Sequence, residues 1–256
     1  MNANEINAKL RSMYQSHIRS FDKKKYDIRN YTNPILMQCS DEYADEDNIR
    51  VLYIGLNAPE WFPGIDTYNT RNGYDLRKAL PLYKRPYVFG DKVFFELISS
   101  INSSLNGERR NNYLWTDVYK FNPRNNKCLK PLVPTPDWKE LNFDIIEHEI
   151  KCSKPDMVFF VTGDLNDKQS KDLEMIEKIF GDGTAYIPVE ECPDVMAIRS
   201  FKRKFAAPMF RIPMVSKRNY SLYENVVTTS TILVLNSNIK FYGKLKRYKT
   251  NQLQNS

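Results

Sequence analysis

The turn Gly55-Leu56-Asn57-Ala58-Pro59 is one of the segments of this sequence that could do chemistry. The apolar run Val51–Ile54 ahead of it predicts a buried strand, and Gly55 lets the chain turn sharply where that strand ends. An asparagine side chain both donates and accepts hydrogen bonds, so Asn57 could hold a water molecule or a ligand there. The alternative is that Asn57 only bonds its own backbone in an Asx turn.

Asp117 supplies a carboxylate within a second predicted strand, Tyr113–Lys120. An ionised carboxylate only accepts hydrogen bonds, so it suits ligand groups that donate, such as the exocyclic amines of cytosine and adenine. Alternatively, Asp117 is a buried carboxylate that backbone NH groups satisfy. Because strands of one sheet end at the same edge, we expect Asn57, Asp117 and Gly163 to line one crevice.

The elements that must position these residues follow an alternating order. Helical spacing predicts helices at residues 3–20, 89–105, 138–152 and 167–180. Apolar, β-branched runs predict strands at residues 51–55, 113–119, 157–162, 185–189, 195–201 and 209–212. Residues 221–235 are β-branched throughout but have the length of a helix, so their state is left open. Helices that separate buried strands predict an α/β domain whose central sheet is mostly parallel and four- or five-stranded.

Positive charge is concentrated in the C-terminal quarter of the chain. After Cys192 there are twelve Lys or Arg residues and two acidic residues, a net charge of +10. The whole chain carries +7, so the first 192 residues carry −3. Clustered cations can bind a phosphate backbone by releasing counterions, which suggests nucleic acid as a partner. A lysine-rich surface in contact only with solvent is an equally good interpretation.

Several other classes of protein are disfavoured. The longest apolar run is far shorter than the roughly 18 residues of a membrane span, so we expect no membrane association. The N-terminus lacks the apolar core of a secretory signal, so we expect a cytoplasmic protein. Its four cysteines have no metal-site spacing and are expected to be reduced and mostly buried. P-loop, HExxH and GxSxG motifs are missing, and we expect no metal and no cofactor.

Four segments in order resemble the uracil-DNA glycosylase superfamily. They are the strand and turn Val51–Pro59, the strand Tyr113–Lys120, the helix, Lys-Pro-Asp turn, strand and glycine of Ile146–Gly163, and the strand and loop Met209–Asn219. The resemblance covers about residues 50–235. It implies a three-layer α/β/α sandwich with a uracil-DNA-glycosylase-like domain at residues 49–236. Residues 1–48 would pack on this core as a helix and polar lead-in, and residues 237–256 would form a basic extension.

The same resemblance assigns roles to individual residues. Asn57 would place water against the sugar of a base flipped out of DNA, and an aromatic of the following loop would stack on that base. Asp117 stands where the family usually reads the base with asparagine. Met214 stands near the usual histidine position and cannot stabilise the leaving base; Ser216, Lys217, Arg218 or Asn219 could do so, and Lys217 is our candidate. The aromatic candidates are Trp61, Phe62, Tyr68 and Tyr74, and the phosphate-binding candidates are Lys202, Arg203, Lys204 and Arg218. His17 and His148 are expected at the surface.

Three functions remain open. The first is a hydrolase that cleaves N-glycosidic bonds in base excision repair, with weak or altered activity, needing Asn57 and water but no metal or cofactor. The second is a catalytically inactive nucleic-acid-binding module of the same fold. Asp117 and Met214 favour the second function or a changed base preference, and DNA is the expected partner in both. The third is an unrelated α/β enzyme for a small anionic substrate.

Overall fold

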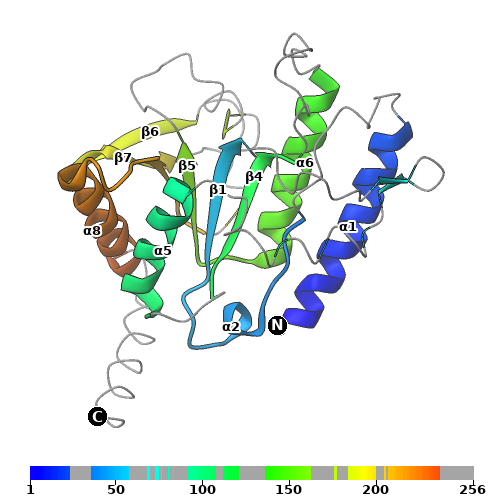
Figure 1. The fold of residues 1–256 in the computed structure, drawn as a ribbon, viewed down its shortest axis with the longest axis horizontal. Coiled ribbons are helices and arrows are strands. Elements are labelled where there is room, and N and C mark those ends of the chain that lie inside the picture. The colour runs from blue at the N-terminus through cyan, green and yellow to red at the C-terminus, as the bar shows by residue number, and fades with distance from the viewer. Residues whose placement is uncertain are drawn as a thin grey trace.

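A six-stranded sheet forms the centre of the structure, which is a computed structural model. It describes residues 1–23, 36–57, 68–69, 73–74, 76, 80, 83, 92–107, 112–120, 136–162, 176–177, 184–199, 205 and 207–236. The strands lie in the order β4-β1-β5-β8-β7-β6 (Figure 1). Their bounds are β1 Val51–Asn57, β4 Leu114–Tyr119, β5 Met157–Thr162, β6 Ala185–Val189, β7 Cys192–Arg199 and β8 Met209–Pro213.

The first four strands of this order are parallel, and the last two are antiparallel to their neighbours. The strands predicted at residues 51–55, 113–119 and 157–162 are confirmed, and they are neighbours, with β1 between β4 and β5. The predicted strand number was wrong, because the β6–β7 hairpin continues the sheet beyond β8 rather than standing apart from it. A separate two-stranded ribbon consists of β2 Tyr68–Asn69 and β3 Gly73–Tyr74.

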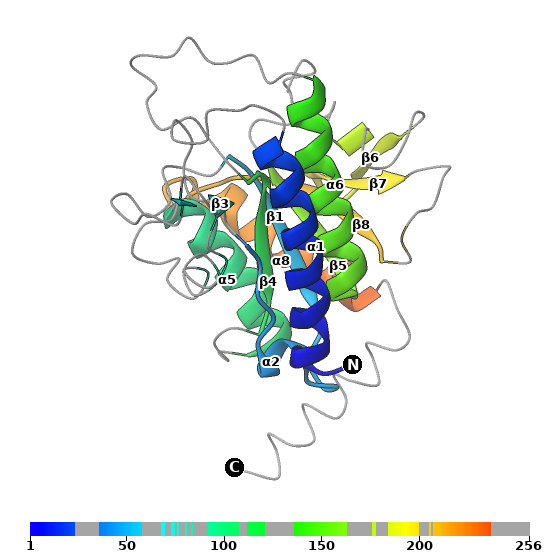
Figure 2. The same ribbon diagram turned by 90° about the vertical axis from the view of Figure 1, so that its right-hand side faces the viewer.

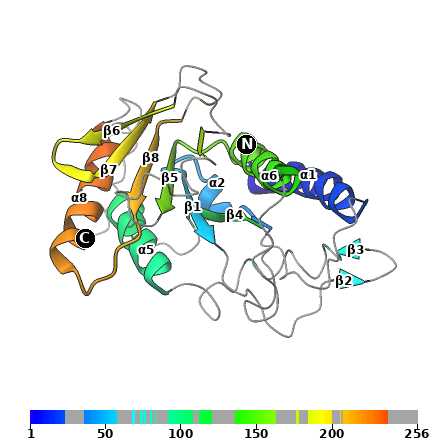
Figure 3. The same ribbon diagram turned by 90° about the horizontal axis from the view of Figure 1, so that it is seen from above.

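Helices cover both faces of the sheet. Their bounds are α1 Ala3–Lys23, α2 Asp41–Ala44, α5 Lys92–Asn106, α6 Pro136–Ser153 and α8 Tyr220–Asn236. Figures 2 and 3 show α5 and α8 on one face and α1 and α6 on the other, with the sheet between them. The arrangement is that of a three-layer α/β/α sandwich. None of the helices within the described ranges is long and apolar enough to cross a lipid bilayer.

Helix α8 settles the open state of residues 221–235. Its buried residues recur at helical spacing, and they are Tyr223, Val226, Val227, Thr229, Ser230 and Val234. A strand would instead bury every second residue. The β-branched side chains of this segment are therefore accommodated in a helix, because packing against α5 and β7 outweighs their weak preference for strand.

The path of the chain marks one edge of the sheet. From β1 it passes through α5 on one face to β4, and then through α6 on the other face to β5, which lies on the far side of β1. Such a reversal of direction is a topological switch point, and ligands of open α/β sheets bind outside the carboxyl ends of the strands at this point. The fold alone therefore directs attention to the ends of β1 and β5, at Asn57 and Thr162.

The cysteines in the described part of the chain are all free thiols. Cys39 and Cys192 are buried and Cys152 is half-buried, whereas Cys128 lies outside the described residues. Burial raises the pKa of the Cys39 thiol to about 12, so it stays protonated at neutral pH. For these three cysteines the expectation of reduced, mostly buried side chains is confirmed.

Candidate functional site

Asp117 and Gly55 make the closest contact at the carboxyl edge of the sheet. They are register partners on the adjacent strands β4 and β1. A Cβ atom added to Gly55 would overlap Asp117 Oδ1 and lie 3.3 Å from Phe94 Cε2 of α5. The missing side chain of Gly55 thus makes room for the Asp117 carboxylate, which is 4% exposed and faces the α5 side of the sheet. A buried carboxylate next to a switch point is a candidate ligand group.

Asn57 closes β1 two residues beyond Gly55. Its backbone is in register with Tyr119, two residues beyond Asp117 on β4. Strand spacing therefore puts the Asn57 and Asp117 backbones about 8 Å apart, which is within reach of one ligand. The Asn57 side chain lies outside the described residues, as do Trp61, Phe62 and Gly163. Tyr74 pairs with Tyr68 through its backbone in the β2–β3 ribbon, whereas its side chain lies outside the described residues.

We expect the substitution Gly55→Ala to destabilise the protein by about 1–3 kcal/mol, the usual effect of overfilling a packed site. The added methyl group would overlap Asp117 Oδ1 and press on Phe94, so the carboxylate has to move. Urea denaturation measures the change in unfolding free energy. In the double variant Gly55→Ala, Asp117→Ala the loss should be partly recovered, and equal losses in the single and double variants would contradict this explanation.

A buried ion pair lies on the opposite face of β4. Lys120 directly follows β4, and its ammonium Nζ is 2.6 Å from Glu149 Oε2 on α6. Both side chains are completely buried. Thr116 Oγ1 donates to the same Glu149 oxygen at 2.9 Å and accepts from Lys120 Nζ. The Lys120 backbone NH donates to Asn142 Oδ1, which adds a second bond between this strand end and α6.

Tyr14 of α1 extends this network to a third element. Its hydroxyl donates to Glu149 Oε1 at 2.5 Å and accepts from the backbone NH of Met37 at 2.8 Å. Burial lowers the pKa of the Lys120 ammonium, and the Glu149 and Asp117 carboxylates oppose that effect. Sequence reasoning missed this pair, because it placed the two residues on separate elements. Two features of the sequence could have indicated this ion pair. They are a lysine directly after a predicted buried strand and a glutamate among the isoleucines of a predicted helix.

An aromatic group covers the outer edge of β4. The Tyr83 hydroxyl donates to the Trp115 carbonyl oxygen at 2.8 Å and accepts from the Trp115 NH at 2.9 Å. The Tyr83 ring stacks on the Trp115 indole, with ring centres 4.9 Å apart, and Phe95 of α5 meets that indole edge to face. Tyr83 therefore satisfies backbone groups that an edge strand leaves unpaired, and it helps to hold β4 in place next to Asp117.

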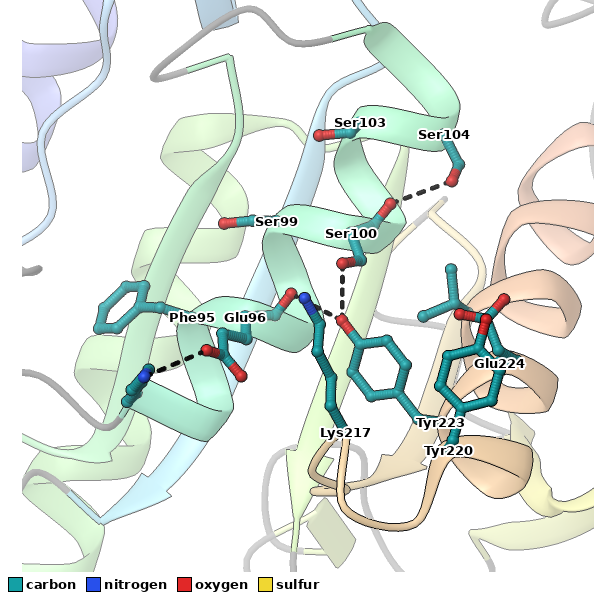
Figure 4. A pocket seen from close by; sticks show the side chains of 12 residues that line it. Phe95, Glu96, Ser99, Ser100, Ser103, Ser104, Lys217, Tyr220, Tyr223 and Glu224 are labelled. Carbon is teal, nitrogen blue, oxygen red and sulfur yellow. Dashed lines mark hydrogen bonds and ion pairs between the residues drawn. The ribbon is translucent and has the colours of Figure 1, made fainter.

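A groove of about 890 Å³ separates α5 from α8 (Figure 4). Tyr223 crosses it from α8, and its hydroxyl lies 2.6 Å from Ser100 Oγ and 3.1 Å from the Glu96 carbonyl oxygen of α5. Lys217 enters the groove from the loop between β8 and α8, with its ammonium 5.8 Å from the Tyr223 ring centre. The rest of the lining combines hydroxyl groups with charged and apolar side chains, from Ser99, Ser100, Ser103, Ser104, Tyr220, Lys92, Glu96, Glu224, Phe95 and Val227.

The predicted site residues thus fall in more than one place. Asp117 and the Asn57 backbone share the carboxyl edge at β1 and β4. Lys217 lines the α5–α8 groove, whose described lining does not include Asp117. Arg218 is exposed in the same loop as Lys217. Lys202, Arg203 and Lys204 lie outside the described residues.

No protein-family model matches the chain, and no curated protein matches it significantly. Within the described residues, no group of three or more His, Cys, Asp or Glu side chains is arranged to hold a metal ion.

Proposed function

We propose that this protein binds DNA and receives an extruded base against Asp117, as a divergent member of the uracil-DNA glycosylase superfamily with weak or altered base-excision activity. The observation that carries the proposal is the buried Asp117 carboxylate packed against Gly55 at the carboxyl edge of the central strands. Asp117 lies two residues before Tyr119, which is the register partner of Asn57 on the neighbouring strand. The proposed base-reading group and the proposed water-placing group can therefore lie in one crevice. Enzymes that act on a base in a duplex must first extrude it into such a pocket.

The chemistry of Asp117 favours a base that presents hydrogen-bond donors. A carboxylate offers acceptors only, and uracil presents two carbonyl oxygens that would face it with further acceptors. The exocyclic amine of cytosine or adenine would complete the pair, and a good paired contact is worth about 1–3 kcal/mol of discrimination. A cytosine-like or adenine-like base, normal or modified, is therefore the preferred substrate class.

The loop after β8 supports contact with DNA. It leaves the same edge of the sheet and exposes Met214 at 43%, and Tyr220, the first residue of α8, is 66% exposed. Lys217 and Arg218 stand exposed between them. Apolar wedges flanked by cations are the means by which proteins unstack and bend a duplex. Lys217 would have to leave the α5–α8 groove to supply positive charge near the leaving base.

Loss of catalysis is the second candidate, and Met214 favours it. This exposed side chain occupies the place where the resemblance expects histidine, and a thioether cannot donate a hydrogen bond to a base anion. Losing one such donor costs about 10²–10³ in rate. A protein that still extrudes a base but cleaves it slowly would therefore serve as a recognition module.

Binding to DNA should weaken steeply as salt is raised. Each phosphate contact contributes about 0.9 to the slope of log affinity against log salt for duplex DNA. Reversing the charges of Lys202, Arg203 and Lys204 should lower that slope, whereas Asn57→Ala should leave it unchanged. Fluorescence anisotropy at several salt concentrations measures both values, and no binding at low salt would exclude both candidate functions.

The catalytic part of the proposal is tested by base excision. The substrates are oligonucleotides that carry uracil, mismatched thymine, and modified cytosine or adenine. We expect slow release of an amino-bearing base, weak or no release of uracil, and a loss of about 10²-fold or more in Asn57→Ala. Rapid uracil release that Asn57→Ala abolishes would make this an ordinary uracil glycosylase. If DNA binds but no base is released, the recognition module is the correct alternative.

A further inference from the structure

The α5–α8 groove opens at the same edge of the sheet as Asp117. Both helices begin at this edge, α5 at Lys92 and α8 at Tyr220, and both of these residues line the groove. Phe95 lines it as well, and its ring meets the indole of Trp115, two residues before Asp117 on β4. Helix α5 therefore borders both the groove and the surroundings of the Asp117 carboxylate, so one extended ligand can reach both.

Lys217 places a positive charge in this groove without a partner of opposite sign. Its ammonium lies 5.8 Å from the centre of the Tyr223 ring, and no carboxylate of the described residues forms an ion pair with it. The other lysine of the lining differs, because Lys92 Nζ lies 3.7 Å from Glu96 Oε1 on the same helix. Lys217 is thus the lining cation that remains available to an anionic ligand such as a phosphate group.

Hydroxyl groups on the α5 wall suit the same kind of ligand. Ser100 and Ser104 point from α5 toward α8, and the Ser100 hydroxyl lies 2.6 Å from that of Tyr223 (Figure 4). Ser99 and Ser103 add two more hydroxyls to the lining. Serine side chains are short, so they leave this wall open, and serine hydroxyls commonly donate to the phosphate oxygens of nucleic acids.

Tyr220 offers a flat aromatic surface at the mouth of the groove, where it is 66% exposed. Aromatic rings presented beside cations are the platforms on which proteins stack unpaired bases. Glu224 follows one helical turn later on α8 and also lines the groove, so its carboxylate repels phosphate from this end. A bound strand is therefore oriented, with its backbone at Lys217 and a base on the Tyr220 ring.

We propose that the α5–α8 groove binds single-stranded DNA next to the base that is extruded against Asp117. This inference rests on the proposed function and extends it, because it makes an unpaired strand, rather than a continuous duplex, the preferred form of the substrate. Stacking and phosphate contacts are sufficient to hold a single strand, whose bases are not covered by partners. The groove volume of about 890 Å³ lies within the usual range for a ligand of nucleotide size.

The test measures binding of a short, fluorescently labelled oligonucleotide of cytosine to the full-length protein by anisotropy. Tyr220→Ala should weaken binding by roughly 5–100-fold, the range for the loss of one base stack, whereas Tyr220→Phe keeps the ring and should bind as the natural protein does. Lys217→Ala should lower the slope of log affinity against log salt by about 0.7, the value for one phosphate of a single strand.

Two exposed residues outside the groove serve as matched controls. Lys9→Ala removes a positive charge from α1, on the opposite face of the sheet, and Ile232→Ala removes a 42% exposed apolar side chain from α8 itself. Both variants should bind the single strand like the natural protein, and circular dichroism should show that all variants are folded.

The outcome for the groove is separable from the outcome for Asp117, because base extrusion is measured in duplex DNA. Unchanged affinity in Tyr220→Ala together with an unchanged salt slope in Lys217→Ala would overturn the groove proposal, even where a base is extruded. So would a natural protein that binds duplex DNA but not the single strand. Groove-dependent binding of the single strand by a protein that extrudes no base would instead refute the proposed function alone.

Discussion

Replacement of Lys120 by methionine is expected to lower the free energy of unfolding by about 3–5 kcal/mol, because it leaves the Glu149 carboxylate buried without its countercharge. The Lys120 ammonium is 2.6 Å from Glu149 Oε2, and neither side chain is exposed to solvent. Methionine nearly fills the volume of the lysine side chain, so the effect reports the charge rather than a cavity. Urea denaturation at neutral pH gives the value.

Two variants separate the buried charge from general effects of losing a lysine. Lys92 is 87% exposed and lies 3.7 Å from Glu96, so Lys92→Met should cost less than about 1 kcal/mol. The double variant Lys120→Met, Glu149→Gln removes both charges and keeps an acceptor for Tyr14, so it should recover part of the loss. A cost for Lys120→Met no larger than that for Lys92→Met would show that the ion pair is unimportant.

The substitution Asp117→Asn is expected to change base preference by about 10–100-fold. An amide presents a donor as well as an acceptor, so the variant can bond the uracil carbonyl oxygens that the carboxylate faces unfavourably. The measured quantity is the ratio of dissociation constants for duplexes that carry uracil or cytosine at one mismatched position. The ratio should shift toward uracil, whether or not the protein cleaves the base.

A charge-matched control accompanies this measurement. Glu190 is exposed directly after β6, at the opposite end of the strand order from β4, and Glu190→Gln removes one negative charge far from Asp117. It should raise affinity for both duplexes equally and leave the ratio unchanged. If Asp117→Asn behaves in the same way, Asp117 does not read the base.

The central strands could be predicted because their sequences satisfy one requirement, the burial of both faces. Strands β1 and β5 are covered on both faces, so they read as unbroken apolar runs, and the strand-end rule then brought Asp117 and Asn57 to one edge. The number of strands could not be predicted. Nothing in the local pattern of residues 185–199 tells whether a hairpin joins the sheet or stands apart from it.

Side-chain placement within the site was less predictable. Lys217 was assigned to the crevice, and the structure instead directs it into the α5–α8 groove over Tyr223, because the loop path after β8 depends on packing between the two helices. The Lys120–Glu149 pair joins residues 29 positions apart on different elements. Neither residue type is expected to be fully buried unless it is paired, so the sequence alone favoured an exposed position for each.

The fluorescence of 2-aminopurine reports whether a base is extruded against Asp117. This analogue replaces the target base in a duplex, presents an amino donor to the carboxylate, and brightens when it leaves the base stack. Addition of the natural protein should raise its emission several-fold. Asp117→Ala should abolish most of that rise while anisotropy shows unchanged DNA binding, and Glu190→Gln should retain it. Binding without any increase in emission, or an equal increase with Asp117→Ala, would contradict extrusion of a base against Asp117.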